Sequence, residues 1–178
     1  MENYPFKEKD AEGADLPHCF RYYVARGYVE PDDKILDLAC GFGAGSNILK
    51  RSLADSVVGM DYRLDCITKA KEDHTEIEFQ QKDLNIIDEL PPCTYSVSIE
   101  TIEHLKDPER FADMLKYYTE ERIFISTPII PSKDTNEHHL HDFIPDDIIA
   151  LFRDDEWRLF HWGSHGGVYG LFYFQKSA

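Results

Sequence analysis

Two acids and two histidines in the second half of the chain have the types and spacing for acid–base or metal chemistry. Glu100, Glu103 and His104 follow an i, i+3, i+4 pattern, so a helical turn there would place them on one face. A histidine with a pKa near ~6.5 can take a proton from a hydroxyl group. The sequence therefore predicts His104 and His139 as bases, with Glu100 or Glu103 orienting an imidazole or a hydroxyl. The alternative is a site for Mg²⁺, Mn²⁺ or Zn²⁺ made by Glu100, Glu103, His104 and His139.

A glycine-rich loop in the first half has the pattern of a nucleotide-binding turn. Residues 35–39 form a short apolar run with the length of a buried parallel strand, and Gly41, Gly43 and Gly45 follow it at alternate positions. Glycine suits a loop that needs positive φ or close contact with a ligand. Asp61 follows the next apolar run, at the distance where a carboxylate binds the two hydroxyl groups of a ribose.

The segment DLACGFGAG resembles the acidic-x-Gly-x-Gly-x-Gly motif of class I S-adenosylmethionine-dependent methyltransferases. The matched residues, in motif order, are Asp37, Ala39, Gly41 and Gly43. A dinucleotide-binding loop is a poorer match, because its third small residue belongs three places after the second glycine, and Gly45 comes one place early.

Three further segments resemble small-molecule and glycan methyltransferases, of the ubiquinone and lipopolysaccharide types. SIETIEHLKDPERF is similar to their "ETIEHL" segment with Asp-Pro and a helix behind it. HCFRYYVA is similar to a His-x-x-Arg-Tyr helix that closes over the cofactor. NEHHLHDFIPDDI resembles their Asn-Pro-x-His-Val-Arg-Glu-Phe segment, where His139 matches the histidine and His141 replaces the arginine.

The resemblance implies O-directed methyl transfer from S-adenosylmethionine to a small molecule or a glycan, with S-adenosylhomocysteine as product. It places Asp83 against the adenine amine. The implied cofactor-binding residues are Arg21, Asp37, Ala39, Gly41, Gly43, Asp61, Tyr62, Asp83, Leu84 and Glu100. Two alternatives stay open. Glu-x-x-Glu-His with a later histidine also resembles the metal site of small-RNA 3′-terminal 2′-O-methyltransferases, and a methyltransferase-fold domain can bind partners without catalysis.

The order of apolar runs and amphipathic segments predicts an α/β, Rossmann-like fold. We expect a doubly wound, seven-stranded, mostly parallel sheet with a C-terminal antiparallel hairpin strand. Strands are expected at 35–39, 56–60, 77–81, 95–99, 122–127, 157–162 and 169–175, and helices at 16–27, 46–53, 64–73, 108–118 and 145–152. Residues 1–15 are expected to form a flexible arm, and 16–178 a single methyltransferase domain.

The composition and charge of the chain indicate which classes of partner and which compartment to expect. With 178 residues, a net charge of −15 and a pI near 4.8, the chain would repel a polyanion, so nucleic acid is not the expected substrate. No apolar run has the length of a membrane span. The four cysteines have no Cys-x-x-Cys pair, and we expect reduced thiols in a cytoplasmic protein.

Overall fold

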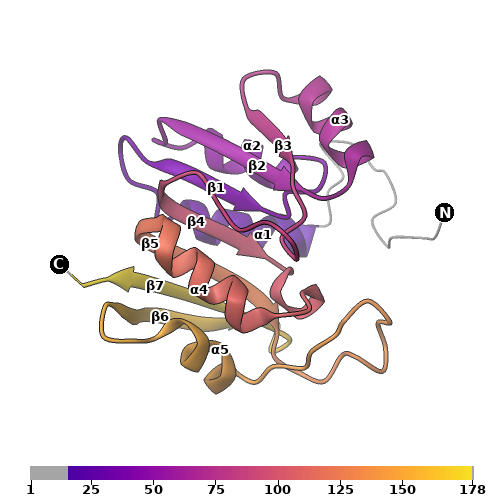
Figure 1. Ribbon diagram of the computed structural model, residues 1–178, viewed down its shortest axis with the longest axis vertical. Helices are drawn as coiled ribbons and strands as arrows, with labels where there is room; N and C mark the ends of the chain where they lie inside the picture. Colours follow the sequence, from indigo (N-terminus) through magenta and orange to yellow (C-terminus); the bar gives the residue numbers. More distant parts are fainter. Residues whose placement is uncertain (1–15, 178) are drawn as a thin grey trace.

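The computed structural model describes residues 16–177, so the arm expected at 1–15 lies outside the described residues. A seven-stranded sheet, in the order β3-β2-β1-β4-β5-β7-β6, is covered by helices on both faces (Figure 1). β1 to β5 pair in parallel, whereas β7 is antiparallel to both β5 and β6. The predicted fold class is confirmed.

The elements have the following bounds. The strands are β1 Lys34–Leu38, β2 Ser56–Asp61, β3 Glu78–Gln81, β4 Cys93–Ile99, β5 Thr119–Pro128, β6 Trp157–His165 and β7 Tyr169–Lys176. The helices are α1 Leu16–Arg26, α2 Ala44–Lys50, α3 Leu64–Asp73, the 3₁₀ turn η1 Ile102–His104, α4 Pro108–Tyr118 and α5 Pro145–Phe152. Asp107 caps α4, because its side chain accepts a hydrogen bond from the Arg110 amide.

The helix after the glycine loop differs from expectation at both ends. α2 begins at Ala44 rather than residue 46, because Gly43 has φ 83 and turns the chain directly into the helix. It ends at Lys50 rather than residue 53. The Leu49 carbonyl accepts both the amide and the hydroxyl of Ser52, three residues on, so the chain leaves the α-helix in a tighter turn.

Two apolar layers fix which way β1 presents its side chains. Leu36 and Leu38 pack into the core under α4 and α5, whereas Ile35 packs under α1 to α3. Asp37 shares the face of Ile35 because side chains alternate along a strand. The only acid of β1 therefore points toward α1 and α2.

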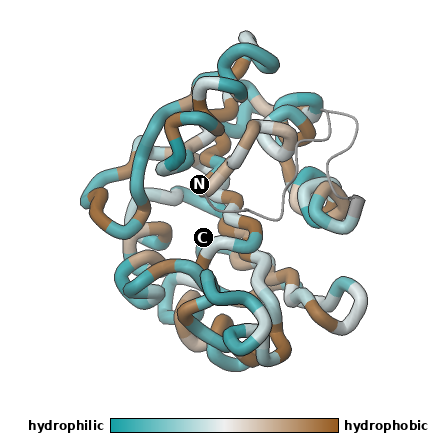
Figure 2. The backbone as a smooth tube through the Cα atoms, turned by 90° about the vertical axis from the view of Figure 1, so that its right-hand side faces the viewer, coloured by the Kyte–Doolittle hydropathy of each residue, from teal (hydrophilic) through white to brown (hydrophobic). Residues whose placement is uncertain are grey.

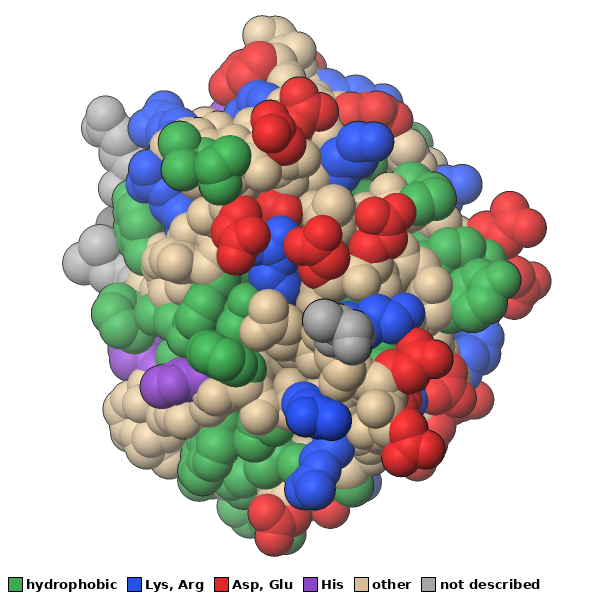
Figure 3. All heavy atoms as spheres, turned by 90° about the vertical axis from the view of Figure 1, so that its left-hand side faces the viewer, with side chains coloured by type: hydrophobic (Ala, Val, Ile, Leu, Met, Phe, Trp, Pro, Cys, Tyr) green, Lys and Arg blue, Asp and Glu red, His purple; other side chains and the backbone are tan. Residues whose placement is uncertain are grey.

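The carboxyl ends of β1, β2 and β4 lie along one edge, at the right in Figure 1 and facing the viewer in Figure 2. The glycine loop, η1 and the segment 129–144 all lie along this edge. The opposite edge presents interspersed acidic and basic side chains (Figure 3). Within residues 16–177, no helix has the length and apolarity needed to cross a membrane.

Candidate active site

Asp37 holds helix α1 against the glycine loop. Its Oδ1 accepts a hydrogen bond of 2.9 Å from the Tyr22 hydroxyl, and its Oδ2 accepts one of 2.6 Å from Ser46 Oγ. Burial is complete and raises the pKa of the Asp37 carboxyl to about 6. Asp37 therefore supports the loop from below, through partners on α1 and α2.

The three loop glycines have different roles. Gly41 has φ 54, and a side chain there would meet no atom of the described residues within 4 Å, so residues 16–177 leave space open beside it. A methyl carbon on Gly43 would lie 2.8 Å from the Phe79 ring. One on Gly45 would lie only 2.1 Å from the Tyr22 ring. Gly45 lets α1 approach, and Gly41 gives the backbone turn that leaves the space open.

Ala39, the first small residue of the loop motif, also has a left-handed backbone, with φ 65. This conformation is uncommon for a residue with a side chain and favours small or polar types. The next residue, Cys40, donates its amide to the Met60 carbonyl and so joins the loop to the end of β2.

Asp61 joins β2 to the glycine loop. It is the last residue of β2 and is only 7% exposed. Its Oδ2 accepts the Gly41 amide and its Oδ1 the Arg63 amide, each at 2.9 Å. Burial raises the pKa of the Asp61 carboxyl. A carboxylate has about four acceptor positions, so capacity remains for a ligand's hydroxyl groups.

The residues expected around adenine lie at the ends of β2 and β3. Tyr62 is 58% exposed beside Asp61. Asp83 follows β3 and accepts hydrogen bonds at Oδ1 from the Asn85 amide and side chain, which leaves Oδ2 for another donor. Leu84 is buried. All three therefore line the same stretch of the carboxyl edge as Asp61, since β2 and β3 are neighbours.

Glu100 does not join the other expected metal ligands. Its backbone has φ 54, and its Oε1 accepts a 2.6 Å hydrogen bond from Ser126 Oγ at the end of β5. Oε1 also lies 3.8 Å from Nε of Arg21 on α1. The four-ligand set expected from the spacing is therefore wrong in this structure. Helical spacing would have needed a regular turn, and the left-handed residue before η1 breaks it.

Glu103, His104 and His139 do come together. One ligand atom from each lies within 4.8 Å of the others. The two imidazole rings are 4.7 Å apart, so the expected approach of His104 and His139 is confirmed. Glu103 is 1% exposed; its Oε2 accepts the Thr127 hydroxyl, whereas its Oε1 has no hydrogen-bond partner among the described residues.

Hydrogen bonds orient both imidazoles. His104 Nδ1 lies 2.9 Å from the His138 carbonyl, so Nδ1 donates and Nε2 is left toward Glu103 Oε1, 4.0 Å away. His139 Nδ1 is hydrogen-bonded to Ser132 Oγ at 2.7 Å. Burial lowers the pKa of His104 and of His139. Burial and the nearby Glu100 carboxylate raise the pKa of Glu103 well above its usual range.

The segment 129–144 carries His139 and is fastened to η1. The amides of Leu140 and His141 both donate to the Glu103 carbonyl, at 2.8 and 3.3 Å. His141, at the position of the family's arginine, is hydrogen-bonded through Nε2 to the Leu105 carbonyl. It therefore anchors the loop, while His139 faces the cluster.

Sequence reasoning missed the hydroxyl groups that orient these acids. Ser126 and Thr127 are buried at the end of β5 and bind Glu100 and Glu103. Their signal was available, because polar residues that end a central parallel strand are unusual in a buried apolar run. Their partners lie more than twenty residues away in sequence.

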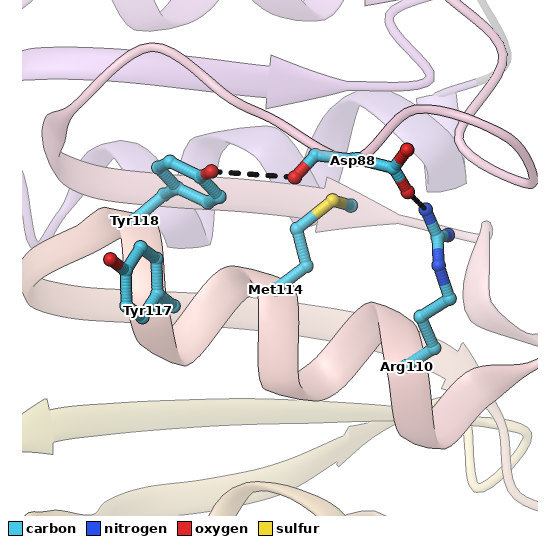
Figure 4. A pocket seen from close by; sticks show the side chains of 5 residues that line it. All are labelled: Asp88, Arg110, Met114, Tyr117 and Tyr118. Carbon is cyan, nitrogen blue, oxygen red and sulfur yellow. Dashed lines mark hydrogen bonds and ion pairs between the residues drawn. The ribbon is translucent and has the colours of Figure 1, made fainter.

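A shallow depression between α4 and the segment that joins β3 to β4 is not part of this site (Figure 4). The residues that line it interact with each other: Arg110 forms an ion pair with the Asp88 carboxylate, and the Tyr118 hydroxyl donates to the Asp88 carbonyl. Arg110 also donates to the carbonyls of Leu84 and Ile87. These contacts hold the segment between β3 and β4 against α4.

The sequence of this chain was compared with family models and with curated proteins. Residues 35–118, just under half of the chain, match the family model described as "Methyltransferase domain". Comparison with curated proteins finds no match. The match runs from the start of β1 to the end of α4, and so includes the glycine loop, Asp61, Glu103 and His104, but not His139.

Solved structures with the same fold are distant in sequence. A candidate methyltransferase in complex with the Haloferax volcanii Trm112 methyltransferase activator has a TM-score of 0.81 at 12% identity, covering 94% of both chains. Magnesium protoporphyrin IX methyltransferase from Synechocystis, solved with bound S-adenosylmethionine, has a TM-score of 0.71 at 15% identity, covering 91% of this chain and 81% of that one. The [4+2]-cyclase SpnF has 0.76 at 11%, covering 95% and 85%. Such a likeness shows the fold, and the cyclase shows that this fold is also found in a protein named for another reaction.

The described chain thus has the Rossmann-like fold of class I methyltransferases, and residues 35–118 match a methyltransferase domain in sequence.

Proposed function

We propose that this protein transfers a methyl group from S-adenosylmethionine to an oxygen of a small molecule or glycan, with residues 16–178 acting as one domain. The observation that carries the proposal is the glycine loop at the end of β1. Among the described residues it leaves space open at Gly41, and it is hydrogen-bonded to Asp61, the carboxylate suited to a ribose. These residues fit a nucleoside-bearing cofactor.

The strand order supports a layout for the two ligands. Along the carboxyl edge, the adenosine-binding candidates lie on β2 and β3, the glycine loop on β1, and the histidine cluster between β4 and β5. A cofactor that lies across β2 and β1 would therefore bring its reactive end toward β4. The acceptor would enter beside Glu103, His104 and His139.

The cluster supplies a base. Methyl transfer from a sulfonium is an in-line displacement with a neutral leaving group, so positioning the acceptor supplies much of the acceleration. A hydroxyl acceptor also has to lose its proton. Because burial lowers the pKa of both histidines, each is neutral at pH ~7 and able to accept that proton.

Binding measurements test the cofactor. We expect S-adenosylhomocysteine to bind in calorimetry and NAD not to bind. Asp61→Ala should weaken the binding by about 1.5–3 kcal/mol, the range for lost hydrogen bonds to a charged group. Lys82→Ala, beside the same strand ends, is the control. NAD binding without a response to S-adenosylhomocysteine would overturn the proposal.

Methyl transfer from labelled S-adenosylmethionine to a panel of sugars, nucleotide sugars and phenols tests the reaction. We expect His104→Ala or His139→Ala to lower the rate by about 10²–10⁴ while cofactor affinity is kept. Cofactor binding with no transfer to any acceptor, including RNA 3′ ends, would instead favour a non-catalytic binding domain. Full activity in both variants would remove the histidines from the mechanism.

A second candidate is a metal-dependent version of the same transfer. It is favoured by the three converging ligand atoms of Glu103, His104 and His139, and by Glu103 Oε1, which has no hydrogen-bond partner among the described residues. Both histidines have Nδ1 hydrogen-bonded to another group, an arrangement that orients metal-binding imidazoles. A divalent ion there would polarise an acceptor oxygen.

The neighbouring His138 makes a matched control for the metal. If a metal is required, EDTA should abolish activity, and added Mg²⁺, Mn²⁺ or Zn²⁺ should restore it. His104→Ala and His139→Ala should also reduce metal content, while His138→Ala, which keeps the backbone carbonyl that His104 contacts, should not. Full activity in excess EDTA would exclude the metal-dependent reaction.

The thiols support a reducing compartment. Cys19, Cys40, Cys66 and Cys93 all lie in the described part of the chain and form no disulfide there. Burial raises the pKa of the Cys40 and Cys66 thiols, which makes them poor nucleophiles. A cytoplasmic location is consistent with cysteines that form no disulfide.

A further inference from the structure

The loop that carries His139 is closed by a single carboxylate oxygen. Oδ1 of Asp142 accepts the Ser132 amide at 2.7 Å and the Lys133 amide at 3.0 Å. The amides of Ser132 and Lys133 lower the pKa of the exposed Asp142 carboxyl, so this carboxyl is ionised at neutral pH. Residues 132–142 therefore form a closed loop between β5 and α5, at the lower right of Figure 1.

The same oxygen lies beside the hydroxyl group that binds His139. Ser132 Oγ is 2.7 Å from Nδ1 of His139 and 3.4 Å from Oδ1 of Asp142. A hydroxyl has one proton, so Ser132 can donate to only one of these two acceptors. If it donated to Nδ1, the lone pairs of its oxygen would face the negative charge of Asp142. The carboxylate therefore attracts the hydroxyl proton, and Ser132 accepts a hydrogen bond from a protonated Nδ1.

His104 has its proton on the same ring nitrogen for a different reason. Its Nδ1 lies 2.9 Å from the His138 carbonyl, which can only accept. In a neutral imidazole, a proton on Nδ1 leaves Nε2 with a free lone pair. Proton transfer from an acceptor hydroxyl and metal binding both need such a lone pair. A backbone group fixes the proton of His104, whereas side chains fix that of His139, so substitution can test only the latter.

We propose that Ser132 and Asp142 are positioning residues that hold His139 as the Nδ1–H tautomer, with Nε2 free to accept a proton. Asp142 binds the hydroxyl proton of Ser132, and Ser132 accepts the proton of Nδ1 in a hydrogen bond. Both residues act through His139, and neither is assigned to the reacting atoms. The tautomer is a property of the loop, whereas its effect on methyl transfer rests on the proposed function.

Nitrogen NMR of the imidazole rings measures the tautomer without any acceptor. Spectra of protein labelled with ¹⁵N at histidine are recorded at about pH 8, where the rings are neutral, and in EDTA, so that no metal binds. Protonated and unprotonated ring nitrogens have well-separated shifts, and the His139 signals are identified by their loss in His139→Ala.

Four variants separate the hydroxyl, the charge and the loop closure. Ser132→Ala removes the hydroxyl but keeps the amides that bind Asp142, and Ser132→Thr restores a hydroxyl. Asp142→Asn removes the charge but keeps an oxygen for the two amides. Asp134→Asn is the matched control, because Asp134 is an exposed acid of the same loop whose side chain has no hydrogen bond or ion pair with a described residue.

The expected result is selective for one ring. In the wild type, Ser132→Thr and Asp134→Asn, His139 should be protonated at Nδ1 alone. Ser132→Ala and Asp142→Asn should move part of the proton population to Nε2, while His104 keeps its tautomer throughout. In these two variants methyl transfer should fall about 10- to 100-fold. Unchanged binding of S-adenosylhomocysteine would show that they are folded.

Three results would contradict the inference. A wild-type His139 protonated at Nε2, or an unchanged tautomer in both Ser132→Ala and Asp142→Asn, would overturn the assignment. A changed tautomer with an unchanged rate of transfer would overturn the positioning role. If the tautomers behave as expected but the wild type neither binds S-adenosylhomocysteine nor transfers a methyl group, the proposed function fails and the tautomer assignment stands.

Discussion

Tyr22→Phe tests whether the buried Asp37 carboxyl is held by α1, and the result should depend on pH. The substitution removes one oxygen atom and keeps the ring that packs over Gly45. What is lost is the 2.9 Å hydrogen bond from the Tyr22 hydroxyl to Asp37 Oδ1. Asp37 keeps its second hydrogen bond, from Ser46.

The size of the effect follows from the protonation of Asp37. Burial raises its pKa from 3.8 to about 6, so the folded state holds the proton more tightly than the unfolded state. Ionisation of Asp37 therefore lowers stability as the pH rises from 3.8 through about 6. The Tyr22 hydroxyl offsets part of this cost, because it favours the charged form. Its loss should cost about 1.5–3 kcal/mol when Asp37 is ionised and about 0.5–1.5 kcal/mol when it is neutral.

Urea denaturation of the wild type and Tyr22→Phe at about pH 5 and about pH 8 measures this difference. We expect the loss in the free energy of unfolding to be larger at the higher pH. Tyr23→Phe is the matched control, since Tyr23 is the next residue of α1 and is 56% exposed. An equal loss at both pH values would refute the argument that Tyr22 stabilises an ionised Asp37.

Two further substitutions test the packing around the site and the opposite edge. Gly45→Ala would place a carbon 2.1 Å from the Tyr22 ring, so α1 must shift. We expect the free energy of unfolding, measured by heat or urea, to fall by about 1–3 kcal/mol. S-adenosylhomocysteine binding should also weaken. Unchanged stability would show that α1 moves freely. Arg122→Ala removes a buried cation 2.6 Å from the buried Asp33 and should cost about 3–5 kcal/mol of unfolding free energy, whereas Arg158→Ala at the exposed surface should cost little. Because Arg122 lies at the start of β5, any remaining folded protein should bind the cofactor normally, and a selective loss of binding would contradict this.

The order of the elements was readable from the sequence because it depends on local properties. Apolar runs of strand length, the Asp107–Pro108 helix start and the glycine loop each act within a few residues. The predicted helices at 64–73, 108–118 and 145–152 agree with the structure in both bounds. The meeting of His104 and His139 was also predictable, because adjacent parallel strands bring their carboxyl ends together.

The roles of individual carboxylates were decided only by the tertiary structure. Spacing placed Glu100 with Glu103 and His104, but its positive φ and the Ser126 hydroxyl turn it toward Arg21. Asp37 matched a cofactor-binding motif, yet both its oxygens are bonded to Tyr22 and Ser46. A side chain's direction depends on the backbone angle of one residue and on partners from distant strands. Sequence periodicity contains neither, so the sequence by itself determined where the acids lie along the sheet edge, and the packed structure decided what each one faces.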